Sequence, residues 1–118
     1  MKKDPRIFLG HIMESIDAIE NHTNGVTKEK FIRNLLIQDA VIRRIEIIGE
    51  AVKNLSSDFK KKHIAIEWRA IAGTRDKLVH EYFGVNLNAI WQTVKKDIPL
   101  LKNQILKLLE NTEQKIFK

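Results

Sequence analysis

The residues with the clearest capacity for chemistry lie in the segment RDKLVHEY, residues 75–82. His80 can exchange a proton near neutral pH, so it could take one from a ribose 2′-hydroxyl or give one to a leaving oxygen. Arg75 stays charged and could grip phosphate oxygens, stabilising the negative charge of a transition state. Both side chains suit RNA cleavage through the internal 2′-hydroxyl, which leaves a 2′,3′-cyclic phosphate. No carboxylates or histidines cluster at metal-ligand spacing, so we expect no metal and no cofactor.

Spacing alone does not bring these side chains together. At about 100° per residue, Arg75 and Tyr82 share a helical face, whereas His80 is turned about 140° from Arg75. Either the helix loosens near its end, where Gly84 marks a stop, or a second copy of the chain completes the site across a two-fold axis. Without further support, the simpler interpretation is a surface arginine paired with a neighbouring carboxylate. Asp76 is an accessory residue in either case, orienting Arg75 or capping locally.

The first half of the chain predicts two helices that could support this segment. Asp4 as N-cap and Pro5 in the first turn predict a helix that continues to about Glu20. A turn containing Asn-Gly follows. Thr27 then predicts the start of one long helix, whose apolar residues recur at helical spacing as far as Leu55.

The second half predicts further helices and no sheet. Residues 56–63 are polar and basic, which indicates a loop or a short helical turn. Apolar periodicity returns over residues 68–82, a helix that carries the candidate site, and a short helix is expected over about 87–96. Asp97, with Pro99 two residues on, predicts the start of the last helix. We therefore expect one all-α domain over residues 1–118, an antiparallel bundle of four main helices plus a short helix.

Composition narrows the class of protein. The 118 residues have 43% hydrophobic side chains, which suits one folded domain with a real core. There are no cysteines, so disulfides, thiolate catalysis and cysteine-based zinc sites are excluded and a cytoplasmic location is expected. The net charge of +6 favours a polyanionic partner such as RNA, although the basic residues are spread along the chain. No apolar stretch is long enough for a signal peptide or a membrane span.

Several other residues are expected to be structural. The two tryptophans, Trp68 and Trp91, lie on apolar stripes and should belong to the core. Gly49 lies inside the long helix and should allow another helix to approach closely. Arg43, Glu46 and Glu50 have the spacing of intrahelical ion pairs on a solvated face. The remaining histidines, His11, His22 and His63, belong to no motif and are given no chemistry.

Two long segments carry a resemblance to a known family. QDAVIRRIEIIGEAVKNL, residues 38–55, and IEWRAIAGTRDKLVHEYFGVNLNAIWQTVKKDIPLL, residues 66–101, closely resemble the HepT-like toxins of the HEPN superfamily. The resemblance covers roughly the chain from Asp4 to the last helix. It includes the family's Arg-x4-His-x-Tyr signature as Arg75, His80 and Tyr82. It also includes the IIGEA stretch at residues 47–51 and Trp91, which precedes the Asp-x-Pro of residues 97–99.

The resemblance implies a function that residue spacing did not supply. It implies a homodimeric helical bundle whose two signature segments face each other in a composite cleft. It implies a metal-independent endoribonuclease toxin with Arg75 and His80 as catalytic residues and RNA as substrate. It also implies an MntA-type nucleotidyltransferase antitoxin that silences the toxin by transferring AMP to Tyr82. The alternative is a non-catalytic adaptor module that docks a nucleotidyltransferase or a nucleotide.

Overall fold

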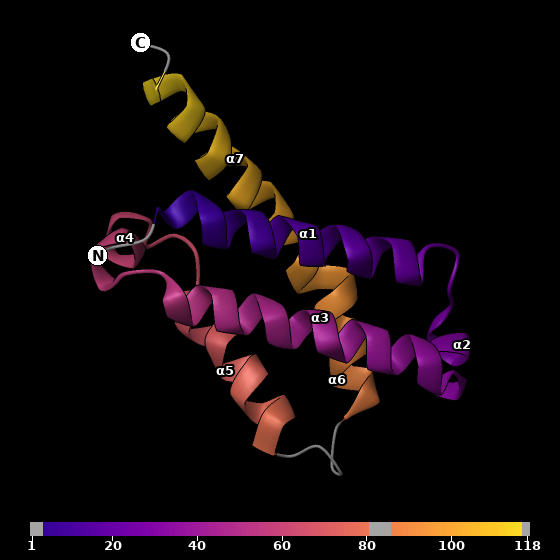
Figure 1. Ribbon diagram of the computed structural model, residues 1–118. Helices are drawn as coiled ribbons and strands as arrows, with labels where there is room; N and C mark the ends of the chain where they lie inside the picture. The colour runs from indigo at the N-terminus through magenta and orange to yellow at the C-terminus, as the bar shows by residue number, and fades with distance from the viewer. Residues whose placement is uncertain (1–3, 81–85, 117–118) are drawn as a thin grey trace.

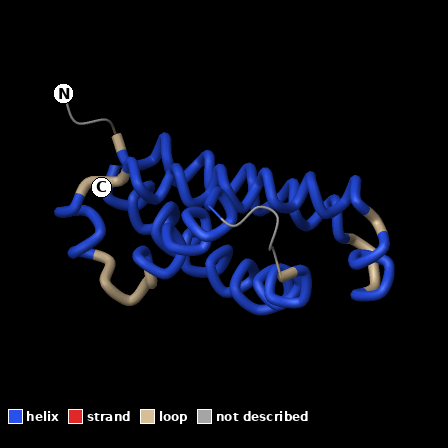
Figure 2. Tube along the Cα trace, turned by 90° about the horizontal axis from the view of Figure 1, so that it is seen from below, coloured by secondary structure: helices blue, strands red, loops and turns tan. Residues whose placement is uncertain are grey.

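The computed structural model describes residues 4–80 and 86–116, and the side chains of residues 4–76 and 86–111. Helices and loops make up the whole of this described part, as Figure 2 shows. The all-α class expected from the sequence is therefore confirmed. The four longest helices are α1 (Pro5–Thr23), α3 (Leu35–Asn54), α5 (Trp68–His80) and α7 (Ile98–Ile116).

The centre of the molecule is the pair formed by α1 and α3, which lie side by side and run in opposite directions (Figure 1). Helix α5 packs against α3, and α7 crosses behind the pair at a steep inclination. The antiparallel arrangement thus holds for α1 and α3, while α7 crosses them obliquely. Between α1 and α7, Lys102 Nζ lies 2.9 Å from Glu20 Oε2.

Local capping explains where α1 begins. The Asp4 side chain accepts a hydrogen bond from the Arg6 amide, and Pro5 occupies the first turn, as the sequence predicts. The buried positions of α1 then recur at helical spacing, so that one face enters the core: Leu9, Ile12, Ile16 and Ile19.

The prediction of one long helix from Thr27 to Leu55 is wrong, because two helices occupy that stretch. Thr27 caps a short helix, α2 (Lys28–Arg33), and the chain leaves helical geometry at Asn34, with φ −113° and ψ 98°. The Asn34 side chain accepts a hydrogen bond from the Ile37 amide and so begins α3. The buried Gln38 side-chain amide donates to the carbonyls of Phe31 and Ile32 at the end of α2, and the Phe31 carbonyl also accepts from the Asn34 backbone amide.

The last helix, α7, begins at Ile98, next to the expected start at Asp97, but no break separates it from the helix before it. The short helix α6 (Leu87–Gln92) continues through a π-helical turn, η2 (Thr93–Asp97), into α7. The backbone stays helical at both Gln92 and Ile98. Pro99 cannot donate to a carbonyl four residues earlier, and a wider turn just before it lets the chain continue without a break. Between α3 and α5, the polar stretch after Leu55 forms a short helix, α4 (Ser57–Lys62).

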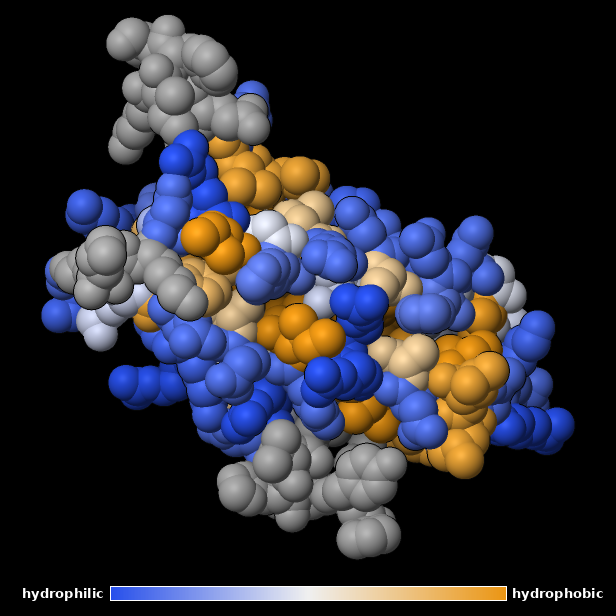
Figure 3. All heavy atoms as spheres, in the orientation of Figure 1, coloured by the Kyte–Doolittle hydropathy of each residue, from blue (hydrophilic) through white to orange (hydrophobic). Residues whose placement is uncertain are grey.

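The core takes buried residues from α1, α2, α3, α5, α6, η2 and α7. Both tryptophans are buried as predicted, and the Trp91 ring lies 5.1 Å from the Phe31 ring, centroid to centroid. Apolar surface is also exposed where α2 meets α3, at Ile32, Leu35 and Leu36, visible as the orange area at the right of Figure 3. No described helix is long and apolar enough to cross a membrane.

Candidate functional site

Arg75 lies on the face of α5 that packs against α3, in the last half of α5. Its side chain is 27% exposed, so the guanidinium is held at the surface by its neighbours. Nη1 donates to Asp76 Oδ1 at 3.1 Å, and Nη2 lies 3.2 Å from Glu50 Oε2. A guanidinium has five N–H donors, so these two contacts leave donors for a phosphate.

Gly49 permits this position of Arg75. A Cβ at Gly49 would lie 2.7 Å from Arg75 Cγ and closer still to its Cβ. Any larger residue would therefore push α5 away from α3, because the atoms in the way lie next to the backbone. The expected close approach of helices at Gly49 is confirmed, and its partner is the helix that carries the candidate site.

Asp76 anchors the arginine from the other side. Its carboxylate also accepts a hydrogen bond from the Lys53 ammonium of α3. Two hydrogen bonds hold the pKa of Asp76 below its usual range. The larger effect comes from Lys53 and the smaller one from Arg75. Asp76 is therefore a carboxylate at neutral pH, and this anchor is lost only as the pH falls through its lowered pKa. Asp76 thus links Arg75 of α5 to Lys53 of α3.

The other two predicted site residues are described less fully. His80 is the last residue of α5, whose backbone is α-helical throughout, but its side chain lies outside the described residues. Tyr82 lies outside the described residues altogether. Because α5 stays α-helical to His80, its described part shows no loosening that would turn His80 toward Arg75. The turn of about 140° between these two positions therefore remains.

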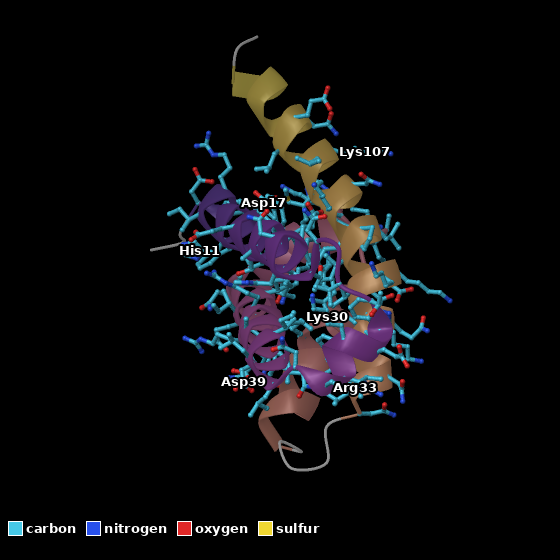
Figure 4. All side chains as sticks on the ribbon, turned by 90° about the vertical axis from the view of Figure 1, so that its right-hand side faces the viewer. His11, Asp17, Lys30, Arg33, Asp39 and Lys107 are labelled. Atoms are coloured by element: carbon cyan, nitrogen blue, oxygen red, sulfur yellow. The ribbon has the colours of Figure 1, made fainter. Side chains whose placement is uncertain are left out.

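A hollow of about 380 Å³ opens beside Arg75, where α1, α3 and α5 meet. Helix α1 contributes Phe8 and His11 to its wall, and α3 contributes Arg43, Glu46 and Glu50. The label in Figure 4 shows His11 on the side of α1 that faces away from α7. The hollow is thus formed by residues far apart in the sequence.

Sequence reasoning missed several of these neighbours. Glu50 was expected in an intrahelical pair, yet it reaches across to Arg75 on α5. His11 was given no chemistry, yet it shares a hollow with Arg75. Arg43 and Glu46 do form the expected pair, but loosely, at 3.9 Å. Gly49 was the one signal in the sequence that could have indicated the contact made by Glu50. A glycine inside a helix suggests that a second helix approaches closely there, and the side chain of the next residue then lies within reach of that second helix.

The chain is similar to several curated proteins. It is 51% identical to a Methanocaldococcus jannaschii protein named "Gamma-glutamylcyclotransferase and putative RNase", covering 97% of this chain but only 51% of that relative. It is 48% identical to a "Probable ribonuclease HepT" of Thermococcus cleftensis, over 92% of this chain and 98% of the relative. It is 44% identical to a "Putative RNase" of Caldanaerobacter subterraneus subsp. tengcongensis, over 92% and 96% of the two chains. The chain spans about half the length of the first of these relatives.

A family model gives the same assignment. The model described as ribonuclease HepT-like matches residues 12–108, from within α1 to within α7. No solved structure matches this chain. The expected enzyme class is confirmed at the level of the family, which is a ribonuclease family. This chain belongs to the ribonuclease HepT-like family.

Proposed function

We propose that this protein is a metal-independent endoribonuclease toxin that acts as a homodimer in the cytoplasm. Arg75 and His80 are its catalytic residues, and a nucleotidyltransferase antitoxin silences it by adenylylating Tyr82. The observation that carries the proposal is the position of Arg75. Its guanidinium is fixed at the edge of a hollow by contacts from two helices, yet it remains partly exposed.

The placement of Arg75 suits a group that stabilises charge on phosphate. A catalytic donor is effective when its position is set before the reaction, because no energy is then spent on reorienting it. Gly49, Glu50 and Asp76 fix the guanidinium in this way. The negative charge of the reacting phosphate grows on its non-bridging oxygens, and the donors of Arg75 that Glu50 and Asp76 leave free would bind them.

The reaction needs proton transfer at two oxygens. A histidine takes the proton of the 2′-hydroxyl while the 2′-oxygen forms a bond to phosphorus. The bond from phosphorus to the 5′-oxygen breaks, and a proton given to that oxygen leaves a 5′-hydroxyl end. The other end keeps a 2′,3′-cyclic phosphate. His80 fits this role by residue type, because an imidazole can exchange a proton near neutral pH.

A second copy of the chain would complete the proposed geometry. Positions 75 and 80 of a regular helix are turned about 140° from each other, so one copy of α5 presents them on different faces. Two copies related by a two-fold axis present two such helices to each other, and Arg75 of one copy could then act with His80 of the other.

Cleavage of RNA by purified variants tests the catalytic part of the proposal. Arg75→Ala should lower the cleavage rate by about 100- to 1,000-fold, as expected when one charge-stabilising donor is lost. His80→Ala should abolish cleavage, and EDTA should leave the wild-type rate unchanged. Arg69→Ala on the same helix and His22→Ala on α1 are matched controls that should cleave normally. Activity that required an added divalent ion would contradict the metal-free reaction, and RNA binding without any cleavage would favour the adaptor module.

Mass spectrometry tests the silencing part of the proposal. Incubation with the antitoxin and ATP should add at least one adenylyl group to the wild-type chain and reduce cleavage in parallel. The added phosphate and adenosine should block the site by both charge and bulk. Tyr82→Phe should take up no adenylyl group and should remain toxic when the antitoxin is present. If the antitoxin neutralises this variant as well as the wild type, silencing works by binding alone.

A further inference from the structure

We propose that the hollow beside Arg75 binds one unpaired base of the RNA and prefers guanine. This inference rests on the proposed function, because the bound base would belong to a nucleotide next to the phosphate that Arg75 contacts. The hollow, of about 380 Å³, is formed by α1, α3 and α5 together. Its described lining residues supply both a surface for stacking and an acceptor for the edge of a base.

The charges of the hollow favour a neutral group over a second phosphate. Arg43 and Arg75 bring two positive charges, and Glu46 and Glu50 bring two negative charges. A site with balanced charge has little net attraction for an anion. A nucleobase is neutral and rich in hydrogen-bonding groups, so it matches this lining better than a phosphate does.

Aromatic side chains line the side of the hollow that belongs to α1. The rings of Phe8 and His11 lie one helical turn apart, with centroids 6.3 Å apart and planes at 87°. Phe8 is partly buried against the core and so is held in place, while His11 is exposed. Proteins that bind single-stranded RNA commonly stack unpaired bases on such rings. A base in the hollow could stack on the His11 ring with Phe8 behind it.

Glu46 supplies the acceptor on the opposite side, on α3. Its side chain is 25% exposed, and among the described residues it pairs with Arg43 at the loose distance of 3.9 Å. Glu50, in contrast, is already paired with Arg75. Glu46 is therefore the carboxylate better placed to meet a ligand.

The chemistry of a carboxylate selects among the bases. An ionised carboxylate only accepts hydrogen bonds, so it binds best to two adjacent N–H donors. Guanine offers such a pair on its Watson–Crick edge, at N1 and at the exocyclic amino group. On the same edge, adenine and cytosine place an acceptor beside their amino group, and uracil has one N–H between two carbonyls. Guanine alone can therefore pair with both oxygens of Glu46.

Binding of mononucleotides tests this inference separately from RNA cleavage. Guanosine 5′-monophosphate should bind the wild-type protein about tenfold more tightly than the adenosine, cytidine or uridine monophosphates, as a two-bond contact to one base implies. NMR titration should show the His11 ring signals shifting on binding. Glu46→Gln should remove the preference for guanine, whereas Glu29→Gln, a carboxylate of α2 outside the hollow, should keep it.

A second pair of variants tests the stacking surface. His11→Ala should weaken binding of all four nucleotides to a similar degree, because every base has a face that stacks. His22→Ala, eleven positions further along the same helix, is the matched control and should bind normally. Circular dichroism of each variant should show unchanged helix content.

The outcomes separate the two proposals. Equal binding of the four nucleotides, a preference for another base, a guanine preference that survives in Glu46→Gln, or no binding at all would each overturn the base site. Guanine-selective binding through Glu46 by a protein that cleaves no RNA would support the base site and reject the ribonuclease mechanism. RNA cleavage by a protein that shows no guanine-selective binding would support the ribonuclease mechanism and reject the base site.

Discussion

At the scale of single residues, the candidate site depends on what surrounds one arginine. Arg75 has a close neighbour without a side chain, Gly49, and two carboxylates that hold its guanidinium, Glu50 and Asp76. Glycine within a helix costs about 1 kcal/mol relative to alanine, so its presence at position 49 opposes the local stability of α3. The close contact with α5 gives a physical reason for that residue type.

Replacing Gly49 should show which is larger, the gain in helix propensity or the cost of crowding Arg75. Gly49→Ala gains about 1 kcal/mol of helix propensity but forces a methyl group against Arg75, an overpacking cost of about 1–3 kcal/mol. We expect a net loss in the free energy of unfolding, measured by urea denaturation, together with slower RNA cleavage. Gly10→Ala is the control, because a Cβ there meets nothing within 4 Å. That variant should be stabilised by about 0.5–1 kcal/mol. A Gly49→Ala protein that is stabilised like Gly10→Ala would contradict the close contact.

At the scale of elements, the separation of α2 from α3 is the feature that local periodicity did not indicate. Apolar residues recur at helical spacing on both sides of Asn34, so the pattern favours one helix. The side chain of Asn34 nevertheless caps α3, and Gln38 binds the carbonyls at the end of α2. These side-chain hydrogen bonds replace the backbone bonds that a continuous helix would make.

The sign of one stability change distinguishes the two arrangements. If Asn34 caps α3, Asn34→Ala should lower the free energy of unfolding by about 1 kcal/mol. If residues 28–54 formed a continuous helix, the same change should raise it, because alanine has the higher helix propensity. Thermal and urea denaturation should both show the loss. Asn34→Asp keeps an acceptor at the cap and should be close to wild type in stability.

At the scale of the whole molecule, α5 holds Arg75 against α3 but leaves the proposed site incomplete. The described length of α5 is regular helix, so positions 75 and 80 lie on different faces of it. A two-fold pair of chains would supply the missing partner, and such pairs are the commonest form of oligomer. The functional unit that we propose is therefore the dimer.

Mixing two inactive chains tests the shared site. Arg75→Ala and His80→Ala chains should be co-expressed with different tags, and the mixed dimer purified through both tags. In a site shared across the interface, one of the two sites keeps both residues, so cleavage should return to a substantial fraction of the wild-type rate. Light scattering should give about twice the 13.7 kDa of one chain. A mixed dimer as inactive as its parents, or a monomeric wild-type protein, would reject the shared site.

The sequence by itself determined the all-helical class, most helix boundaries and the core positions of Trp68 and Trp91. Helical periodicity and caps such as Asp4 and Thr27 depend on residues within about one turn of each other, so they can be recognised locally. The same sequence indicated Arg75, and its family relationship indicated the class of enzyme. Only the tertiary structure decided what surrounds that arginine. Glu50 of α3 pairs with it and His11 of α1 lines the same hollow, and both depend on how helices pack, which no local pattern encodes.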